Sequence, residues 1–135
     1  MPYLALKISR PLPATAARQL AGSLTGLTVA LLGKKREVTA VAIEMASPGH
    51  WFVGGNEVDP CPGTAFHLEI LITEGTNTEQ EKADFIAAAW SALETALGPL
   101  ASASYCVIRD HDGRAWGYGG ITQTARRRAA AGASL

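Results

Sequence analysis

The chain has 135 residues, and its 12 Lys and Arg side chains balance its 12 Asp and Glu side chains, so the formal net charge is zero. A neutral chain has no overall attraction to nucleic acid or to an anionic membrane surface, and no apolar run approaches the ~20 residues of a membrane span. The length fits one domain that can bury a core.

The N-terminal segment is not expected to be a secretory signal, because Lys7 and Arg10 interrupt it and no apolar stretch follows. Cys61 and Cys106 are far apart and share no spacing typical of metal ligands. We therefore expect a cytoplasmic protein with reduced thiols and no metal site.

The first half of the chain predicts a strand, a helix and a second strand. The first strand, Tyr3–Ile8, directly follows Pro2, and a helix is expected to start at Pro13 or Thr15. Gly33 is expected to end this helix. The second strand is predicted over residues 38–45, and residues 51–55 are expected to form a turn or a short hairpin. Leucines at helical spacing predict the buried face of the helix: Leu20, Leu24, Leu27 and Leu31.

The second half predicts the same order after a linker at residues 56–63. Apolar and polar side chains alternate over residues 65–72, which is typical of a strand. Thr78 is a good N-cap for a second helix, and residues 104–110 form the last predicted strand. The buried face of the second helix is predicted to hold Phe85, Ala89, Leu93 and Leu97. From Arg126 onward we expect either a loosely held tail, with residues 129–135 flexible, or a helix that docks on a neighbouring subunit.

The two halves are related by an internal repeat. The sequence WFVGG at residues 51–55 recurs as WGYGG at 116–120, 65 residues later, and Gly33 recurs as Gly98 at the same offset. We therefore expect one domain over residues 1–128, built of two β-α-β units, 2–55 and 65–120. Each unit should pair its strands in parallel through a right-handed crossover. The predicted fold class is α+β: a four-stranded mixed sheet with both helices on one face, whose other face self-association would cover.

Pro2 is the first candidate for chemistry. If Met1 is removed, the chain begins with a secondary amine, and an α-amino group has a pKa of roughly 7.7–8.0. Burial or nearby cations lower that pKa, so the Pro2 amine could serve as a general base near neutral pH. If Met1 stays attached, the nitrogen of Pro2 is an amide and cannot act as a base.

The strand that begins at Pro2, the repeated unit and the segment VTAVAIEMASPGHWFVGG at residues 38–55 together resemble the tautomerase superfamily. The segment is similar to the second strand and hairpin of 4-oxalocrotonate tautomerase (4-OT). The length is similar to that of fused members such as macrophage migration inhibitory factor (MIF), cis-3-chloroacrylic acid dehalogenase and malonate semialdehyde decarboxylase. The resemblance implies a trimer with active sites at the subunit boundaries around the N-terminal proline.

The resemblance also implies roles for individual residues. Gly33 and Lys34 match the Gly-Lys of MIF, whose lysine lies at the active site, and Lys34 would bind a substrate carboxylate. Ile72 matches a position that contributes a backbone group. Tyr105 matches a tyrosine that the neighbouring subunit supplies. Arg10 and Arg109 are further candidate substrate-binding cations.

Simpler interpretations remain open for most of these residues. Lys34 could only complement the helix dipole, and Tyr105 could only contribute packing. Thr73 and Thr76 stand where the dehalogenase carries arginines, which disfavours dehalogenation. The run Arg126, Arg127, Arg128 is too short to predict nucleic-acid binding in a neutral chain.

The resulting hypothesis is a keto–enol tautomerase that acts on a small enol or 2-keto carboxylic acid. Pro2 would be the base, and neither a cofactor nor a metal is expected. The expected partners are a small carboxylate substrate and two further copies of the chain, with no nucleic acid and no membrane. One alternative is a hydratase, dehalogenase or decarboxylase of a small unsaturated or keto acid. A second alternative, if Met1 is retained, is a trimeric binding protein without activity.

Overall fold

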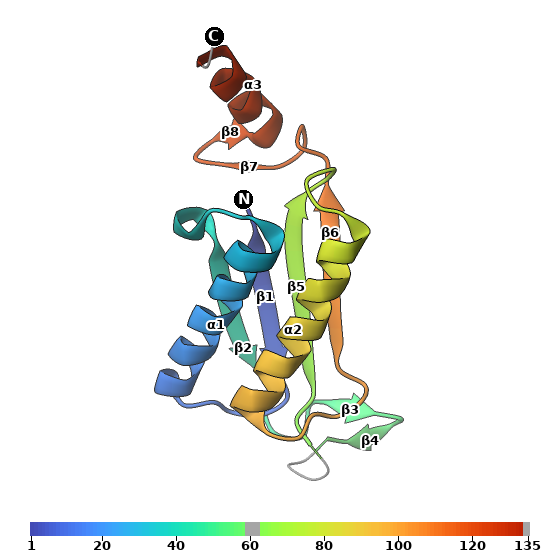
Figure 1. The fold of residues 1–135 in the computed structure, drawn as a ribbon. Coiled ribbons are helices and arrows are strands. Elements are labelled where there is room, and N and C mark those ends of the chain that lie inside the picture. Colours follow the sequence, from blue (N-terminus) through green and yellow to red (C-terminus); the bar gives the residue numbers. More distant parts are fainter. Residues whose placement is uncertain (59–62, 134–135) are drawn as a thin grey trace.

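The computed structural model describes residues 1–58 and 63–133. Its main sheet has four strands in the order β2-β1-β5-β6. β1 runs parallel to β2, antiparallel to β5, and β5 runs parallel to β6. The strands are β1 (Tyr3–Ile8), β2 (Ala40–Met45), β5 (Phe66–Thr73) and β6 (Tyr105–His111). Helices α1 (Ala14–Leu32) and α2 (Glu79–Leu97) lie side by side on one face of this sheet (Figure 1). The predicted α+β class, with two β-α-β units and a mixed sheet, is confirmed.

Each unit ends in a short hairpin. The first pairs β3 (Phe52–Val53) with β4 (Asn56–Glu57), and the second pairs β7 (Gly117–Tyr118) with β8 (Ile121–Thr122). Both turn through two glycines at positive φ, 60° and 80° in the first hairpin and 61° and 77° in the second. Glycine adopts such angles without steric cost, so the Gly-Gly pairs of the repeat encode two matching turns.

The core lies between the helices and the sheet. In β1, Leu4, Leu6 and Ile8 are buried, while the residues between them face the other side. The four residues predicted for the buried face of α2 are all buried. In α1 the prediction needs correction, because Thr28 and Leu32 are buried in place of the half-buried Leu27 and Leu31. Thr28 tolerates burial because its hydroxyl donates a 2.8 Å hydrogen bond to the carbonyl of Leu24.

The helix ends follow the local sequence. Thr78 caps α2 in a full capping box, in which the carboxylate of Glu81 accepts a hydrogen bond from the backbone N–H of Thr78. Gly33 ends α1 in the left-handed conformation, at φ 66°. α1 begins at Ala14, with Pro13 as its N-cap residue. Gly33 fixes where the chain leaves α1, and Lys34 directly follows it.

The second strand is shorter than predicted. Residues 36–38 form a 3-10 turn, η1 (Arg36–Val38), and β2 begins only at Ala40. The backbone N–H of Thr39 donates to the carbonyl of Arg36 at 3.1 Å, and its hydroxyl donates to the carbonyl of Lys35 at 2.7 Å. These local bonds hold Val38 and Thr39 out of the sheet.

The C-terminal segment forms a third helix, α3 (Gln123–Ala133). Figure 1 shows α3 and the β7–β8 hairpin beyond the end of the sheet at which β1 begins. The structure thus gives a helix where the sequence left open a loosely held tail. Residues 129–133 belong to that helix, and 134–135 lie outside the described residues. Within 1–58 and 63–133, no helix has the length and apolar character needed to cross a membrane.

The sheet face turned away from α1 and α2, the helix-free face, carries the alternate side chains of the four strands. Tyr3 of β1 is 41% exposed there and Tyr105 of β6 is 64% exposed. Glu69 and Arg109 form an ion pair between β5 and β6. The helix-free face is therefore a mixture of exposed aromatic and charged side chains.

Candidate functional site

Pro2 lies buried at the start of β1. Its carbonyl accepts a 3.3 Å hydrogen bond from the backbone N–H of Ala40, and the next residue, Tyr3, is paired with both β2 and β5. Because β1 is one of the two central strands, the sheet fixes this end of the chain from both sides. An apolar cavity of about 310 Å³ opens here, and its lining includes Met1, Pro2 and Tyr118.

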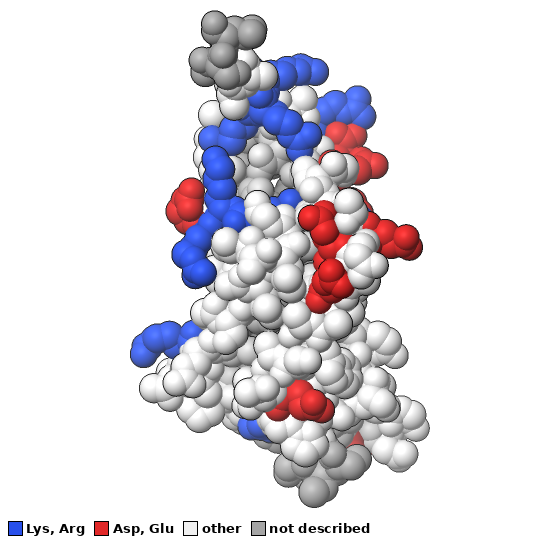
Figure 2. Space-filling view, viewed as in Figure 1, with Lys and Arg blue, Asp and Glu red and all other residues white. Residues whose placement is uncertain are grey.

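A second cavity, of about 400 Å³, adjoins the first through Met1, Val38 and Tyr118, which line both. Four cationic side chains line it, and no carboxylate does so among the described residues. These are Lys34 and Lys35 from the end of α1, and Arg126 and Arg127 from α3. We call this space the cationic cavity. In Figure 2 blue side chains gather over the part of the molecule where Figure 1 places α3 and the end of α1.

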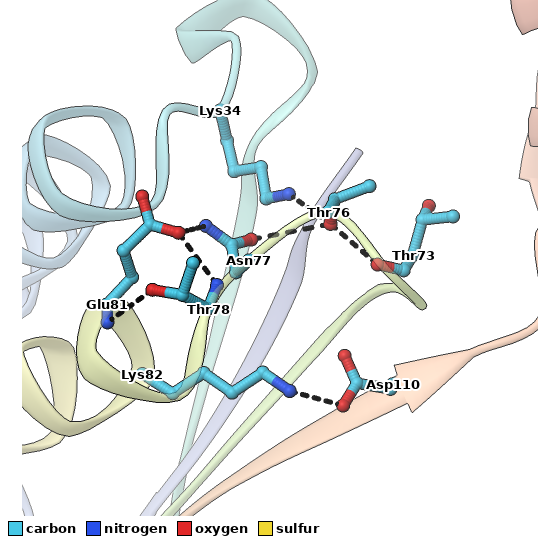
Figure 3. Close-up of polar contacts among 8 residues, drawn as sticks. All are labelled: Lys34, Thr73, Thr76, Asn77, Thr78, Glu81, Lys82 and Asp110. Atoms are coloured by element: carbon cyan, nitrogen blue, oxygen red, sulfur yellow. Dashed lines mark hydrogen bonds and ion pairs between the residues drawn. The ribbon is translucent and has the colours of Figure 1, made fainter.

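Lys34 is half-buried at the wall of the cationic cavity, directly after Gly33. Its Nζ donates a 2.8 Å hydrogen bond to Oγ1 of Thr76, and that hydroxyl donates to the carbonyl of Thr73 at 2.6 Å (Figure 3). The amide of Asn77 donates to the carbonyl of Leu32 at 2.9 Å and so ties the end of α1 to the junction before α2. These contacts hold the ammonium group toward the cavity.

Burial and nearby positive charges lower the pKa of two amines in this region. Burial lowers the pKa of the Met1 α-amino group, and the nearby charges of Lys34, Lys35 and Arg127 lower it further. Burial also lowers the pKa of Lys34; Glu81 opposes that shift and Arg127 adds to it. An amine at this end of β1 therefore releases its proton at a lower pH than a free α-amino group does.

Ile72 has a fully buried side chain and lines neither cavity. Tyr3 pairs with Leu71, so one more step in the antiparallel register would set Pro2 opposite Ile72. Only a backbone role is left open for Ile72, which is the kind of role that the sequence resemblance implies.

Arg10 lies at the other end of β1. Its Nε donates to Oγ1 of Thr64 at 2.8 Å and its Nη2 donates to the carbonyl of Leu97 at 2.9 Å. The six residues of β1 lie between it and Pro2, a length of roughly 20 Å at about 3.3 Å per residue. Within one chain the structure does not bring Arg10 to Pro2, because β1 carries the two residues to opposite ends of the sheet.

Tyr105 shares the far end of the sheet with Arg10. It begins β6 and pairs with His67, which in turn pairs with Lys7 near the end of β1. Within one chain Tyr105 is thus remote from Pro2. Arg109 is closer along the strands, since Leu71 pairs with both Arg109 and Tyr3, but its guanidinium forms the ion pair with Glu69 on the helix-free face.

Both threonines that stand in place of the dehalogenase arginines already have hydrogen-bond partners. Oγ1 of Thr73 accepts a 3.1 Å hydrogen bond from the indole Nε1 of Trp116, and Thr76 bonds to Lys34. Trp116 thereby connects the second hairpin to the main sheet. Neither threonine can supply the positive charge of an arginine.

Three residues that line these cavities were not predicted as site residues from the sequence: Tyr118, Arg126 and Arg127. Arg126 donates from Nη2 to the carbonyl of Tyr118 at 2.7 Å, and its guanidinium carbon lies 3.8 Å from the centre of the Tyr118 ring. The sequence signal was the run of three arginines, which was considered only as a nucleic-acid contact.

No site for a metal or a reactive thiol is formed by the part of the chain that the structure describes. No group of three or more His, Cys, Asp or Glu side chains is placed to hold a metal ion there. Burial raises the pKa of the Cys106 thiol to about 12, so the thiol is protonated at neutral pH. Cys61 lies outside the described residues.

No protein-family model and no curated protein sequence matches the chain. Solved structures do. Native fused 4-OT matches at 23% identity with a TM-score of 0.78, over 91% of this chain and 97% of its own. Pt0534 inactivated by 2-oxo-3-pentynoate matches at 21% identity with a TM-score of 0.82, over 92% and 98%. The MIF-like protein of Entamoeba histolytica matches at 16% identity with a TM-score of 0.74, over 90% and 97%. The chain therefore has the tautomerase fold.

Proposed function

We propose that the chain is a keto–enol tautomerase for a small enol or 2-keto carboxylic acid, with Pro2 as the base once Met1 is removed. The observation that carries this proposal is the position of the terminal amine. It lies at the start of a central strand, between an apolar cavity and a cationic one. An amine that acts as a base needs the apolar cavity, which lowers its pKa, and the substrate carboxylate needs the positive charge of the cationic cavity.

The proposed reaction uses one group as base and then as acid. The nitrogen of Pro2 takes the proton from the enol hydroxyl, and the electrons of that O–H bond form the carbonyl as the enol double bond moves to a C–H bond. The protonated amine supplies the proton for that bond, so the amine is neutral again at the end. Lys34 holds the carboxylate and stabilises the negative charge that develops next to it.

The electrostatics support a base of this kind. Burial and the charges of Lys34, Lys35 and Arg127 lower the pKa of the amine that now ends the chain at Met1. We expect the same surroundings to lower the pKa of the Pro2 amine after Met1 is removed. Such an amine is neutral at a lower pH than a free one, and only the neutral form can accept a proton.

We also propose that the protein is a homotrimer, as is the fused 4-OT described as a wild-type symmetric trimer. Two features support this assembly. The helix-free face carries the exposed aromatic side chains of Tyr3 and Tyr105, and Tyr105 can reach a Pro2 site only on another copy of the chain. Light scattering should then report three times the 14.1 kDa of one chain. A monomer with full activity would contradict the assembly.

Dehalogenation or hydration of an unsaturated acid in the same site is disfavoured, because Thr73 and Thr76 offer no bidentate cation for the carboxylate. A trimeric binding protein without activity is favoured only if the mature chain keeps Met1, since Pro2 is then an amide.

The experiment combines the mass of the intact chain with an assay of enol ketonisation. Protein without Met1 should ketonise phenylenolpyruvate, and a form that keeps Met1 should not. The matched comparison is the same preparation before and after treatment with methionine aminopeptidase. Equal activity of the two forms would exclude the Pro2 amine as the base, inactivity of both would contradict the tautomerase proposal, and a mature chain whose intact mass still includes Met1 would favour the binding protein.

A further inference from the structure

α3 is held over the cationic cavity by Arg126. Its guanidinium stacks on the ring of Tyr118 and donates to the carbonyl of the same residue at 2.7 Å. The backbone N–H of Gln123, at the start of α3, donates to the carbonyl of Trp116 at 3.0 Å, and Trp116 itself bonds to Thr73. A chain of contacts therefore connects α3 to the strand that ends beside the cavity.

The side chain of Arg127 does not hold α3 in place in this way. Arg127 lines the cationic cavity, yet its side chain takes part in no hydrogen bond or ion pair within residues 1–58 and 63–133. The neighbouring Arg128 is exposed and lines neither cavity. Arg127 is exposed as well, but of the two only Arg127 lines the cationic cavity.

The wall beside Arg127 contains donors without acceptors. Nε2 of Gln123 and Nε of Arg126 are buried and have no hydrogen-bond partner among the residues that the structure describes. Both residues line the cationic cavity. A buried donor left unpaired destabilises the protein, and an oxyanion is the kind of acceptor that these donors lack. The unpaired donors and the uncompensated cations point to the same occupant, an anion.

We propose that α3 is a recognition helix, in which Arg127 binds the carboxylate of the ligand opposite Lys34 while Arg126 and Tyr118 hold the helix in place. The ligand's identity as an enol or keto acid rests on the proposed function, whereas the binding of a carboxylate does not. A guanidinium can donate two parallel hydrogen bonds to a carboxylate, and Lys34 adds one from the other wall. The residue thus determines specificity for anionic over neutral ligands.

The test measures binding of two unreactive probes, 3-phenylpropanoate and its neutral amide, by NMR titration of the chain without Met1. Arg127→Gln should weaken binding of the carboxylate about tenfold and leave binding of the amide within a factor of two. Arg128→Gln is the matched control and should change neither. Arg127→Lys should recover part of the loss, because it restores the charge without the second hydrogen bond.

Two outcomes would overturn the proposal. One is carboxylate binding by Arg127→Gln within a factor of two of the parent, and the other is an equal loss for carboxylate and amide, which would indicate that α3 only shapes the cavity. The proposed function fails separately. If the chain without Met1 binds the carboxylate through Arg127 but does not ketonise phenylenolpyruvate, recognition stands and the tautomerase proposal falls.

Discussion

The cationic side chains at the two ends of the central strand β1 differ in whether they are hydrogen-bonded to the protein. At the Arg10 end, the guanidinium donates hydrogen bonds to protein acceptors, which include the hydroxyl of Thr64 and the carbonyl of Leu97. At the Pro2 end, four cationic side chains line one cavity, and Arg127 has no protein acceptor within the described residues. A cationic side chain that is hydrogen-bonded to protein acceptors stabilises the fold. A cationic side chain that lines a cavity beside an amine can instead bind a ligand.

The comparison also separates the two repeats. Both units begin with a strand, but only β1 follows a chain end, whereas β5 continues from the preceding segment. β5 is the more buried of the two: Phe66, Leu68, Ile70, Ile72 and Thr73 are all buried. Both strands supply side chains to the core, but under the proposed function only the unit that starts at Pro2 carries the base, so we expect one active site per chain.

Replacement of Pro2 should have the largest effect. Pro2→Ala in the chain without Met1 should lower kcat for phenylenolpyruvate ketonisation by ~10²–10⁴-fold, the usual contribution of a general base. Pro11→Ala, beside Arg10 at the other end of β1, is the control and should retain the parent activity. A Pro2→Ala enzyme within a factor of about three of the parent, against that expectation, would remove the distinction between the two ends.

Arg10→Ala should act on stability and not on the reaction. It removes three hydrogen bonds, a long one to the carbonyl of Pro11 among them, and leaves the carbonyl of Leu97 and the 4% exposed Thr64 without their donor. The free energy of unfolding should fall by about 1–3 kcal/mol in urea titrations, with KM unchanged. A rise in KM for carboxylates at unchanged stability would instead place Arg10 in the site of a neighbouring subunit.

Lys34→Ala should raise KM for carboxylate substrates about tenfold, the equivalent of 1.4 kcal/mol, and should move the acidic limb of the pH–rate profile to higher pH. The sign follows from the charge: without the Lys34 ammonium the pKa of the Pro2 amine rises, so Pro2 keeps its proton to a higher pH. The profile of kcat/KM against pH measures this shift.

Thr78→Ala is the control for that variant, because Thr78 lies in the same hydrogen-bonded junction but carries no charge. It should lower the free energy of unfolding by about 1 kcal/mol and leave both KM and the acidic limb unchanged. If Lys34→Ala costs only the roughly 0.3–1 kcal/mol of a helix-dipole contact and shifts neither quantity, Arg127 is left as the anion contact.

The fold was predictable where one residue decides the local conformation. Gly33 and Thr78 mark helix ends, and the Gly-Gly pairs mark both hairpins. The error in α1 arose from the helical period. The predicted leucines are spaced four, three and four residues apart, which fits a turn of 3.6 residues, but α1 buries residues at a uniform spacing of four and so takes Thr28 and Leu32 in place of Leu27 and Leu31.

The site was predictable only in part, because its cations come from distant positions. Pro2 lines the apolar cavity and Lys34 lines the adjoining cationic cavity, and the roles that the resemblance to the tautomerases implies for them stay predictions. Arg127 could not be found by spacing, because it reaches the cavity only after the β7–β8 hairpin turns the chain and Arg126 stacks on Tyr118. Tyr105 is assigned by resemblance alone until the assembly is known.

The start of β1 and helix α3 lie at the same end of the sheet (Figure 1), which has a practical consequence for anyone who handles the protein. An affinity tag joined before Pro2 would convert its nitrogen to an amide, and a tag joined after α3 would hang beside the cationic cavity. Either choice would yield well-folded material that performs poorly in an assay. The exposed Gly54–Gly55 turn of the first hairpin, at the other end of the molecule, is the place to insert a label that leaves both untouched.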